Sequence, residues 1–168
     1  MSPRPPKTKV RACYPGDPDC VGEDYGLWAG QNLSSDLPMV IIDTFGDDIP
    51  DEPKIHASMG IIYNGEGEIN HVSIPPLYHF GNIGIERRGN STQGFDKLSY
   101  AVETWDPDLM DTNENFFGMG GEEDWILHAM HIDKTQIRFP FTFRLFQQMG
   151  HYASEWQFVE LVINGDYR

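Results

Sequence analysis

Two segments of alternating apolar and polar residues, 83–89 and 97–105, constrain the fold more than any other feature of the sequence. They flank a short polar turn in the stretch GIERRGNSTQGFDKLSYAVE, residues 84–103, with two arginines before the turn and one lysine after it. Alternation with a period of two is typical of half-buried β-strands. The pattern therefore predicts two strands joined by a polar turn.

Two further segments upstream are predicted to be β-structure. Residues 37–45, LPMVIIDTF, are rich in β-branched side chains and predict a buried strand that starts just after Pro38. Residues 57–74 predict a hairpin, because Asn64 and Gly65 form an Asn-Gly turn signal between apolar runs. The N-terminal half of the domain is therefore expected to be a sheet.

One helix is predicted in the last third of the chain. Asp133 can cap a helix that extends to about Met149, with Gly150 as its C-terminal stop. Pro140 fits only the first turn or a kink, so the regular helix is expected to begin near Phe139.

The C-terminal segment 155–168 predicts a strand that leads into an Asn-Gly turn at Asn164 and Gly165. Only three residues follow this turn, so we expect no second strand and an unpaired edge on the first. The chain is accordingly expected to stop where a larger fold would continue.

Residues 1–36 are predicted to be a leader or linker, and residues 37–168 to form one domain. The first segment is rich in Pro, Gly, Asp and Ser and shows no sustained period. Its cysteines, Cys13 and Cys20, flank a Pro-Gly-Asp-Pro turn, which is compatible with a local disulfide or with two free thiols.

The chain is strongly acidic, with 12 Lys and Arg against 26 Asp and Glu. A field of this sign repels phosphate backbones, so nucleic acid is not an expected partner. No run approaches the roughly 20 apolar residues that span a bilayer. The basic N-terminus is not followed by the apolar region of a signal peptide. Anionic ligands are expected only where Arg and Lys gather, as they do in residues 84–103.

The turn in this stretch has the chemistry of an anion-binding loop. Gly89, Asn90, Ser91 and Thr92 offer small side chains, backbone amides and hydroxyls, and Lys97 can add a positive charge. The alternative is a polar turn whose charged flanks face water. Local chemistry alone favours this alternative, because no strict phosphate-loop motif is matched.

Other catalytic and metal-binding patterns are weak. His128 and His131 share the spacing of one helix face but lack the remainder of a zinc-protease signature. Residues 111–122 begin with the spacing of a calcium loop, but Phe116 occupies the position that requires glycine. There is no G-x-S-x-G elbow, so hydrolase activity is not expected.

Four blocks, at residues 37–70, 83–103, 122–138 and 147–167, resemble in order the CotH kinase family, the spore coat protein H-like atypical protein kinases. The most specific block fits R-G-N-S-[ST]-x-x-[FY]-x-K-x-[SP]-Y from Arg88 to Tyr100. It is followed by D-W-x-L and by D-K-x-x-x-R, which ends at Arg138. Several blocks in the same order are harder to obtain by chance than any one of them.

The resemblance implies an α+β fold, the N-terminal lobe of a protein-kinase-like domain, in which an antiparallel β-sheet packs against one main helix. It implies ATP and Mg²⁺ as cofactors of the complete domain, which phosphorylates protein serines. Lys97 would be the catalytic lysine that contacts phosphate, and Arg138 a residue on the nucleotide side. The residues implied to form a loop near the nucleotide phosphates are Arg88, Gly89, Asn90 and Ser91.

The sequence departs from the family pattern at Leu98, where a second lysine is common, and at Phe139 and Pro140, where the helix usually continues with Asn. The blocks with the catalytic and metal-binding aspartates do not follow. Phosphoryl transfer depends on a positioned metal and base, so this chain alone is not expected to be an active kinase.

The alternative function is a non-catalytic binding module, adhesin- or coat-like. The family resemblance favours an extracellular location or the surface of a cell or spore. Expected partners are a protein substrate or a coat or surface protein, with strand pairing at the C-terminal edge.

Overall fold

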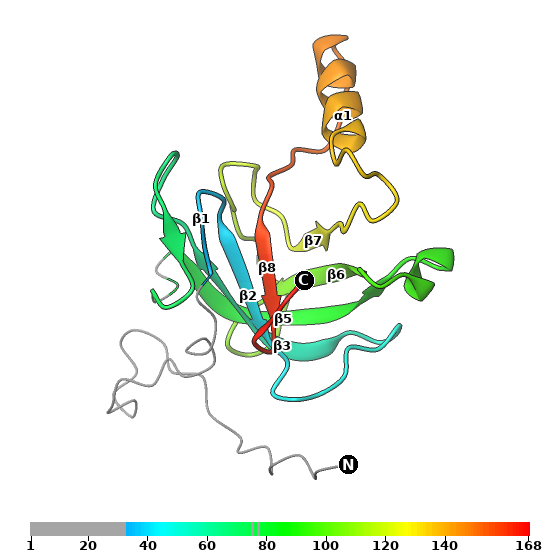
Figure 1. Cartoon of the computed structure of the whole chain (residues 1–168). Coiled ribbons are helices and arrows are strands. Elements are labelled where there is room, and N and C mark those ends of the chain that lie inside the picture. The colour runs from blue at the N-terminus through cyan, green and yellow to red at the C-terminus, as the bar shows by residue number, and fades with distance from the viewer. Residues whose placement is uncertain (1–32, 75, 77) are drawn as a thin grey trace.

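The computed structural model describes residues 33–74, 76 and 78–168. This part of the chain forms a strongly curved β-sheet with one helix that stands apart from it (Figure 1). The strands of the main sheet are β2 (Met39–Asp43), β3 (Ile55–Ile62), β5 (His79–Arg88), β6 (Ser99–Trp105), β7 (Asp124–Leu127), β8 (Glu160–Ile163) and β9 (Asp166–Tyr167). Their order in this seven-stranded sheet is β7-β6-β5-β3-β2-β8-β9.

A separate ribbon pairs β1 (Ser34–Ser35) with β4 (Asn70–His71). Neighbours in the main sheet are antiparallel except β2 and β8, which run parallel, with Val40 opposite Leu161. Because β2 lies between β3 and β8, both of its edges are hydrogen-bonded and all of its residues are buried. The two cysteines lie outside the described residues.

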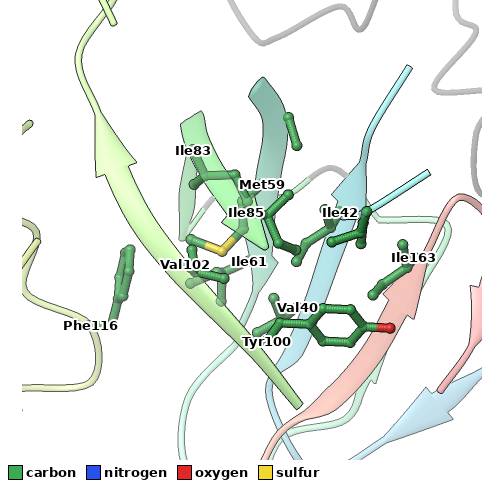
Figure 2. Close-up of a cluster of buried hydrophobic side chains, with 12 residues drawn as sticks. Val40, Ile42, Met59, Ile61, Ile83, Ile85, Tyr100, Val102, Phe116 and Ile163 are labelled. Carbon is green, nitrogen blue, oxygen red and sulfur yellow. The ribbon is translucent and has the colours of Figure 1, made fainter. Parts of the chain in front are cut away.

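The sheet buries apolar side chains on both faces. The larger core is formed by strands that lie far apart in the sheet order, and Figure 2 shows Tyr100 of β6 among side chains of β2, β3, β5 and β8. The smaller core, on the other face, consists of Met39, Ile41, Ile62, Val72 and Val162. Curvature thus lets the sheet cover much of its own apolar surface, and each fully buried Ile or Val contributes about 1.5–3 kcal/mol.

The expected α+β kinase-like lobe, with an antiparallel sheet packed on a main helix, is wrong. The fold is β-rich, the sheet contains a parallel pair, and the helix does not cover it. Within α1 (Arg138–Gln148) Pro140 is the one buried residue. The larger core is instead closed by the curvature of the sheet and by Phe116 and Trp125, so it has no need of a helical layer.

The predicted hairpin over residues 57–74 is also wrong. Both edges of β3 are occupied, by β2 and by β5, so the residues after Asn64 cannot pair with it. The backbone N–H of Asn64 donates to Oδ1 of Asn70 at 2.8 Å, and the side chain of Asn64 donates to the carbonyl of Ile69 at 2.9 Å. These bonds hold a loop that delivers β4 to β1.

The C-terminal turn does have a second strand, contrary to the expectation. Asn164 and Gly165 adopt φ values of 52° and 81°, as a type I′ hairpin turn requires. The turn leads into β9, which pairs antiparallel with β8 and places Asp166 opposite Ile163. β9 therefore covers the C-terminal half of this edge of β8, at Val162 and Ile163.

The strand just after Pro38, the two alternating strands and the end of the helix are confirmed. Gly150 has a φ of 83° and donates its N–H to the carbonyl of Gln147, so the chain leaves the helix there. Residues 124–127 form the short strand β7. In the described residues, no helix has the length and apolar character needed to cross a membrane.

Candidate anion-binding site

A cavity of about 220 Å³ brings together residues from three separate parts of the chain. It lies between the 3₁₀ helix η1 (Ser91–Gly94) with the start of β6, the segment that follows β7, and the first residues of α1. Its lining includes Lys97, His128, His131 and Arg138. Lys97 and Arg138 carry positive charge and Asp133 carries negative charge, in a chain whose net charge is −14.

Lys97 and Arg138 both have donors that an anion can use. Lys97 is exposed at the rim and forms no hydrogen bond or ion pair with any residue that the structure describes. Arg138 has a side chain that is 78% exposed, and its Nε lies 3.5 Å from Oδ1 of Asp133. Lys97 and Arg138 therefore both line the cavity, and both have exposed side chains.

Asp133 fixes the start of α1 and the position of Arg138. Its carboxylate accepts hydrogen bonds from the hydroxyl of Thr135 at 2.6 Å, from the N–H of Thr135 at 3.1 Å and from the N–H of Arg138 at 2.9 Å. The hydroxyl bond is the main reason that the pKa of Asp133 lies below its usual value. Asp133, the predicted cap, thus accepts a hydrogen bond from the first helical residue, Arg138, although Ile137 occupies the N-cap position.

The spacing of the two histidines suggested one face of a helix, but neither histidine lies on a helix. Nδ1 of His128 lies 3.4 Å from Oγ of Ser99, and its ring contacts Phe139 with centroids 4.9 Å apart. His131 stacks on Phe95 at 5.0 Å. These contacts hold the segment after β7 against the start of β6. The spacing of the histidines predicted a shared helix face and not this cavity, which two other predicted residues, Lys97 and Arg138, also line.

The four loop residues implied by the motif lie beside this cavity and do not line it. Arg88, Gly89, Asn90 and Ser91 are exposed at the end of β5 and in the following turn. Gly89 has a φ of 99°, and a Cβ at this position would overlap the Thr92 hydroxyl. The turn therefore folds tightly onto Thr92, which does line the cavity. The binding role of the four residues stays a prediction.

The described residues contain no group of three or more His, Cys, Asp or Glu side chains that could hold a metal ion. Asp133 is the one carboxylate that lines the cavity, and Thr135 and Arg138 already occupy it. The described residues at this cavity therefore do not fit Mg²⁺, and its charged lining consists of Lys97, Arg138 and Asp133.

A family model described as CotH kinase protein matches residues 85–168, half of the chain. The matched region includes η1, Lys97, both histidines and α1. No curated protein and no solved structure matches the chain.

Proposed function

The chain belongs to the CotH kinase protein family, and from this premise we propose that it supplies the phosphate-binding part of an atypical kinase that transfers phosphate from ATP to protein serines. The observation that supports the proposal is the cavity lined by both Lys97 and Arg138. A lysine offers a point charge to phosphate, and an arginine offers a planar pair of donors.

The size of the cavity indicates which part of ATP it receives. Pockets that enclose drug-sized ligands have volumes of roughly 300–1,000 Å³, whereas this cavity measures about 220 Å³. It suits a chain of phosphates, and the adenosine would lie outside it. Lys97 and Arg138 then bind and orient the phosphates, and the N-terminal turn of α1 lies beside them.

The cavity is proposed to bind the phosphates of ATP, but its residues do not supply every group that phosphoryl transfer needs. Asp133 is a poor general base, because its oxygens are hydrogen-bonded and its pKa is lowered. The catalytic base and the metal ligands of the reaction would have to come from elsewhere. The isolated chain is therefore proposed to bind ATP without phosphorylating a substrate.

A second candidate is a non-catalytic interaction module at a cell or spore surface. The exposed apolar side chains of α1, such as Phe141 at 65%, favour it, because such surface usually meets a partner. This candidate requires no affinity for ATP.

Calorimetric titration of ATP with Mg²⁺ into the parent chain and a Lys97→Ala variant tests the proposal. The variant should bind about tenfold more weakly or worse, because a hydrogen bond to a charged group contributes about 1.5–3 kcal/mol. Arg144→Ala is the control, since it removes a positive charge from α1 outside the cavity. Absence of binding by the parent chain at millimolar ATP would overturn the proposal and leave the interaction module.

A further inference from the structure

An exposed apolar stripe runs along α1 and its two flanking residues, and it consists of Ile137, Phe141, Leu145 and Met149. Residues four apart lie on the same side of a helix, and these four side chains are 60%, 65%, 47% and 63% exposed. The opposite side carries Phe139 and Phe143, which contact each other. The stripe has the spacing by which a helix docks into an apolar surface.

The charges around the stripe restrict its partner. From residue 134 to residue 154 there is no Asp or Glu, whereas Lys134, Arg138 and Arg144 lie in this segment. Arg144 forms no ion pair with any described residue. A complementary surface would be apolar with an acidic border. Pairing of two such helices is disfavoured, because it would bring arginines together without a carboxylate.

The same chain presents a surface of this kind in the turn formed by residues 106–111. Leu109 and Met110 are 47% and 64% exposed, and they lie between the exposed carboxylates of Asp108 and Asp111. Oδ1 of Asp106 accepts bonds from the N–H groups of Asp108, at 2.8 Å, and Met110, at 3.0 Å. The turn therefore has a fixed shape before any partner arrives.

The backbone of this turn supports a role for its apolar tip. Leu109 has a φ of 61°, a conformation that glycine or asparagine adopts at less cost. The bonds from Asp106 hold the leucine in this conformation, with its side chain exposed to solvent.

We propose that the apolar stripe of α1 docks on the 106–111 turn of a second copy of the chain. Leu145 and its neighbours contact Leu109 and Met110, and Arg144 pairs with the carboxylates of Asp108 and Asp111. Two such contacts related by a two-fold axis close a dimer. The proposal goes beyond the phosphate-binding function and does not depend on the cavity.

Sedimentation equilibrium of the full chain, from about 1 μM to about 1 mM, tests the proposal. The apparent mass should rise from one chain to two, with a smaller rise at high salt because the paired charges are screened. Leu145→Asp should remain one chain across the range. Ile69→Asp, an exposed apolar residue at 61%, is the matched control and should dimerise like the parent.

Reversing the charges of Arg144 and of Asp108 with Asp111 tests whether α1 and the 106–111 turn contact each other, and it does not depend on the result of a single variant. Arg144→Glu should weaken the dimer at least tenfold, and so should Asp108→Lys combined with Asp111→Lys. All three changes together should restore it to within about threefold of the parent, because the attraction is re-established with opposite signs. Circular dichroism shows whether each variant is folded. A monomer at every concentration, a dimer that persists in Leu145→Asp, or failure of the triple variant to recover would overturn the proposal.

Discussion

Lys97 and Arg138 line one cavity, although the first precedes β6 and the second begins α1. The contacts that hold the segment after β7 beside the start of β6 join residues far apart in the sequence. Ser99 and Phe95 hold His128 and His131, and Asp133 holds the first residue of the helix. Two positive side chains are thereby held in a strongly acidic protein, and this is the main physical support for anion binding.

The volume of the cavity leads to a prediction about ligand size. Because about 220 Å³ suits phosphates better than a whole nucleotide, inorganic tripolyphosphate should displace ATP from the chain, and adenosine should not. Competition calorimetry measures both. Displacement by adenosine alone would show that the base, and not the phosphates, determines binding.

The free energy of unfolding should depend on the buried strand residues. Ile42 is fully buried in the larger core, so Ile42→Ala should lower the free energy of unfolding by about 2–5 kcal/mol. Ile69→Ala, at a side chain that is 61% exposed, should change it by less than about 0.5 kcal/mol. Urea denaturation followed by circular dichroism compares the two. Equal effects would show that β2 is not at the centre of the core.

Gly84 should not tolerate a side chain, because a Cβ there would overlap the ring of Trp105. Gly84→Ala should cost about 1–3 kcal/mol of stability, and the cost should shrink when Trp105→Ala is also present. Gly94→Ala is the control, since its Cβ would have no neighbour within 4 Å. Urea denaturation again provides the measurement, and a Gly84→Ala cost that is unchanged in the Trp105→Ala background would contradict the packing.

Stability should fall in mildly acidic solution because of His79. Burial lowers the pKa of His79 from its ordinary value of about 6.5, with partial opposition from Glu114, and its Nε2 has no hydrogen-bond partner among the described residues. The unfolded chain therefore binds the proton more readily than the folded chain. His79 therefore has no pH-dependent effect on stability well above pH 6.5 and destabilises the folded chain increasingly as the pH falls below that value.

Measured between pH 8 and pH 5, the free energy of unfolding should decrease as the pH falls below about 6.5, with a slope that steepens toward a maximum of about 1.4 kcal/mol per pH unit. His79→Gln should flatten the curve in this window. A parent curve that matches His79→Gln would show that His79 does not titrate differently on folding.

The strands that could be predicted from the sequence are those whose pattern reflects their own burial. The continuous apolar run of β2 is buried along its whole length, and the alternation in β6 matches its alternating burial. The failed hairpin shows the limit of a local signal. Gly65 does adopt a positive φ of 118°, yet the chain after it pairs elsewhere because β3 already has two neighbours.

Pairing between strands that lie far apart in the sequence could not be predicted. The parallel pairing of β2 with β8 joins segments near opposite ends of the domain, and no local pattern specifies such a partner. The predicted bounds of the helix agree with α1, but the exposure of its apolar stripe could not be predicted, because it depends on which other elements pack against the helix. At the site, the motif drew attention to Arg88 and its neighbours, whereas Lys97 and Arg138 are the predicted residues that line the cavity.

The most direct test of the central account is calorimetric titration of inorganic tripolyphosphate into the parent chain, Lys97→Ala, Arg138→Ala and Arg88→Ala. Lys97→Ala and Arg138→Ala should each lower the affinity for tripolyphosphate by about tenfold or more. Arg88→Ala should stay within about threefold of the parent, because Arg88 does not line the cavity. Equal affinity in all four proteins, or a larger loss in Arg88→Ala than in Lys97→Ala, would contradict the account.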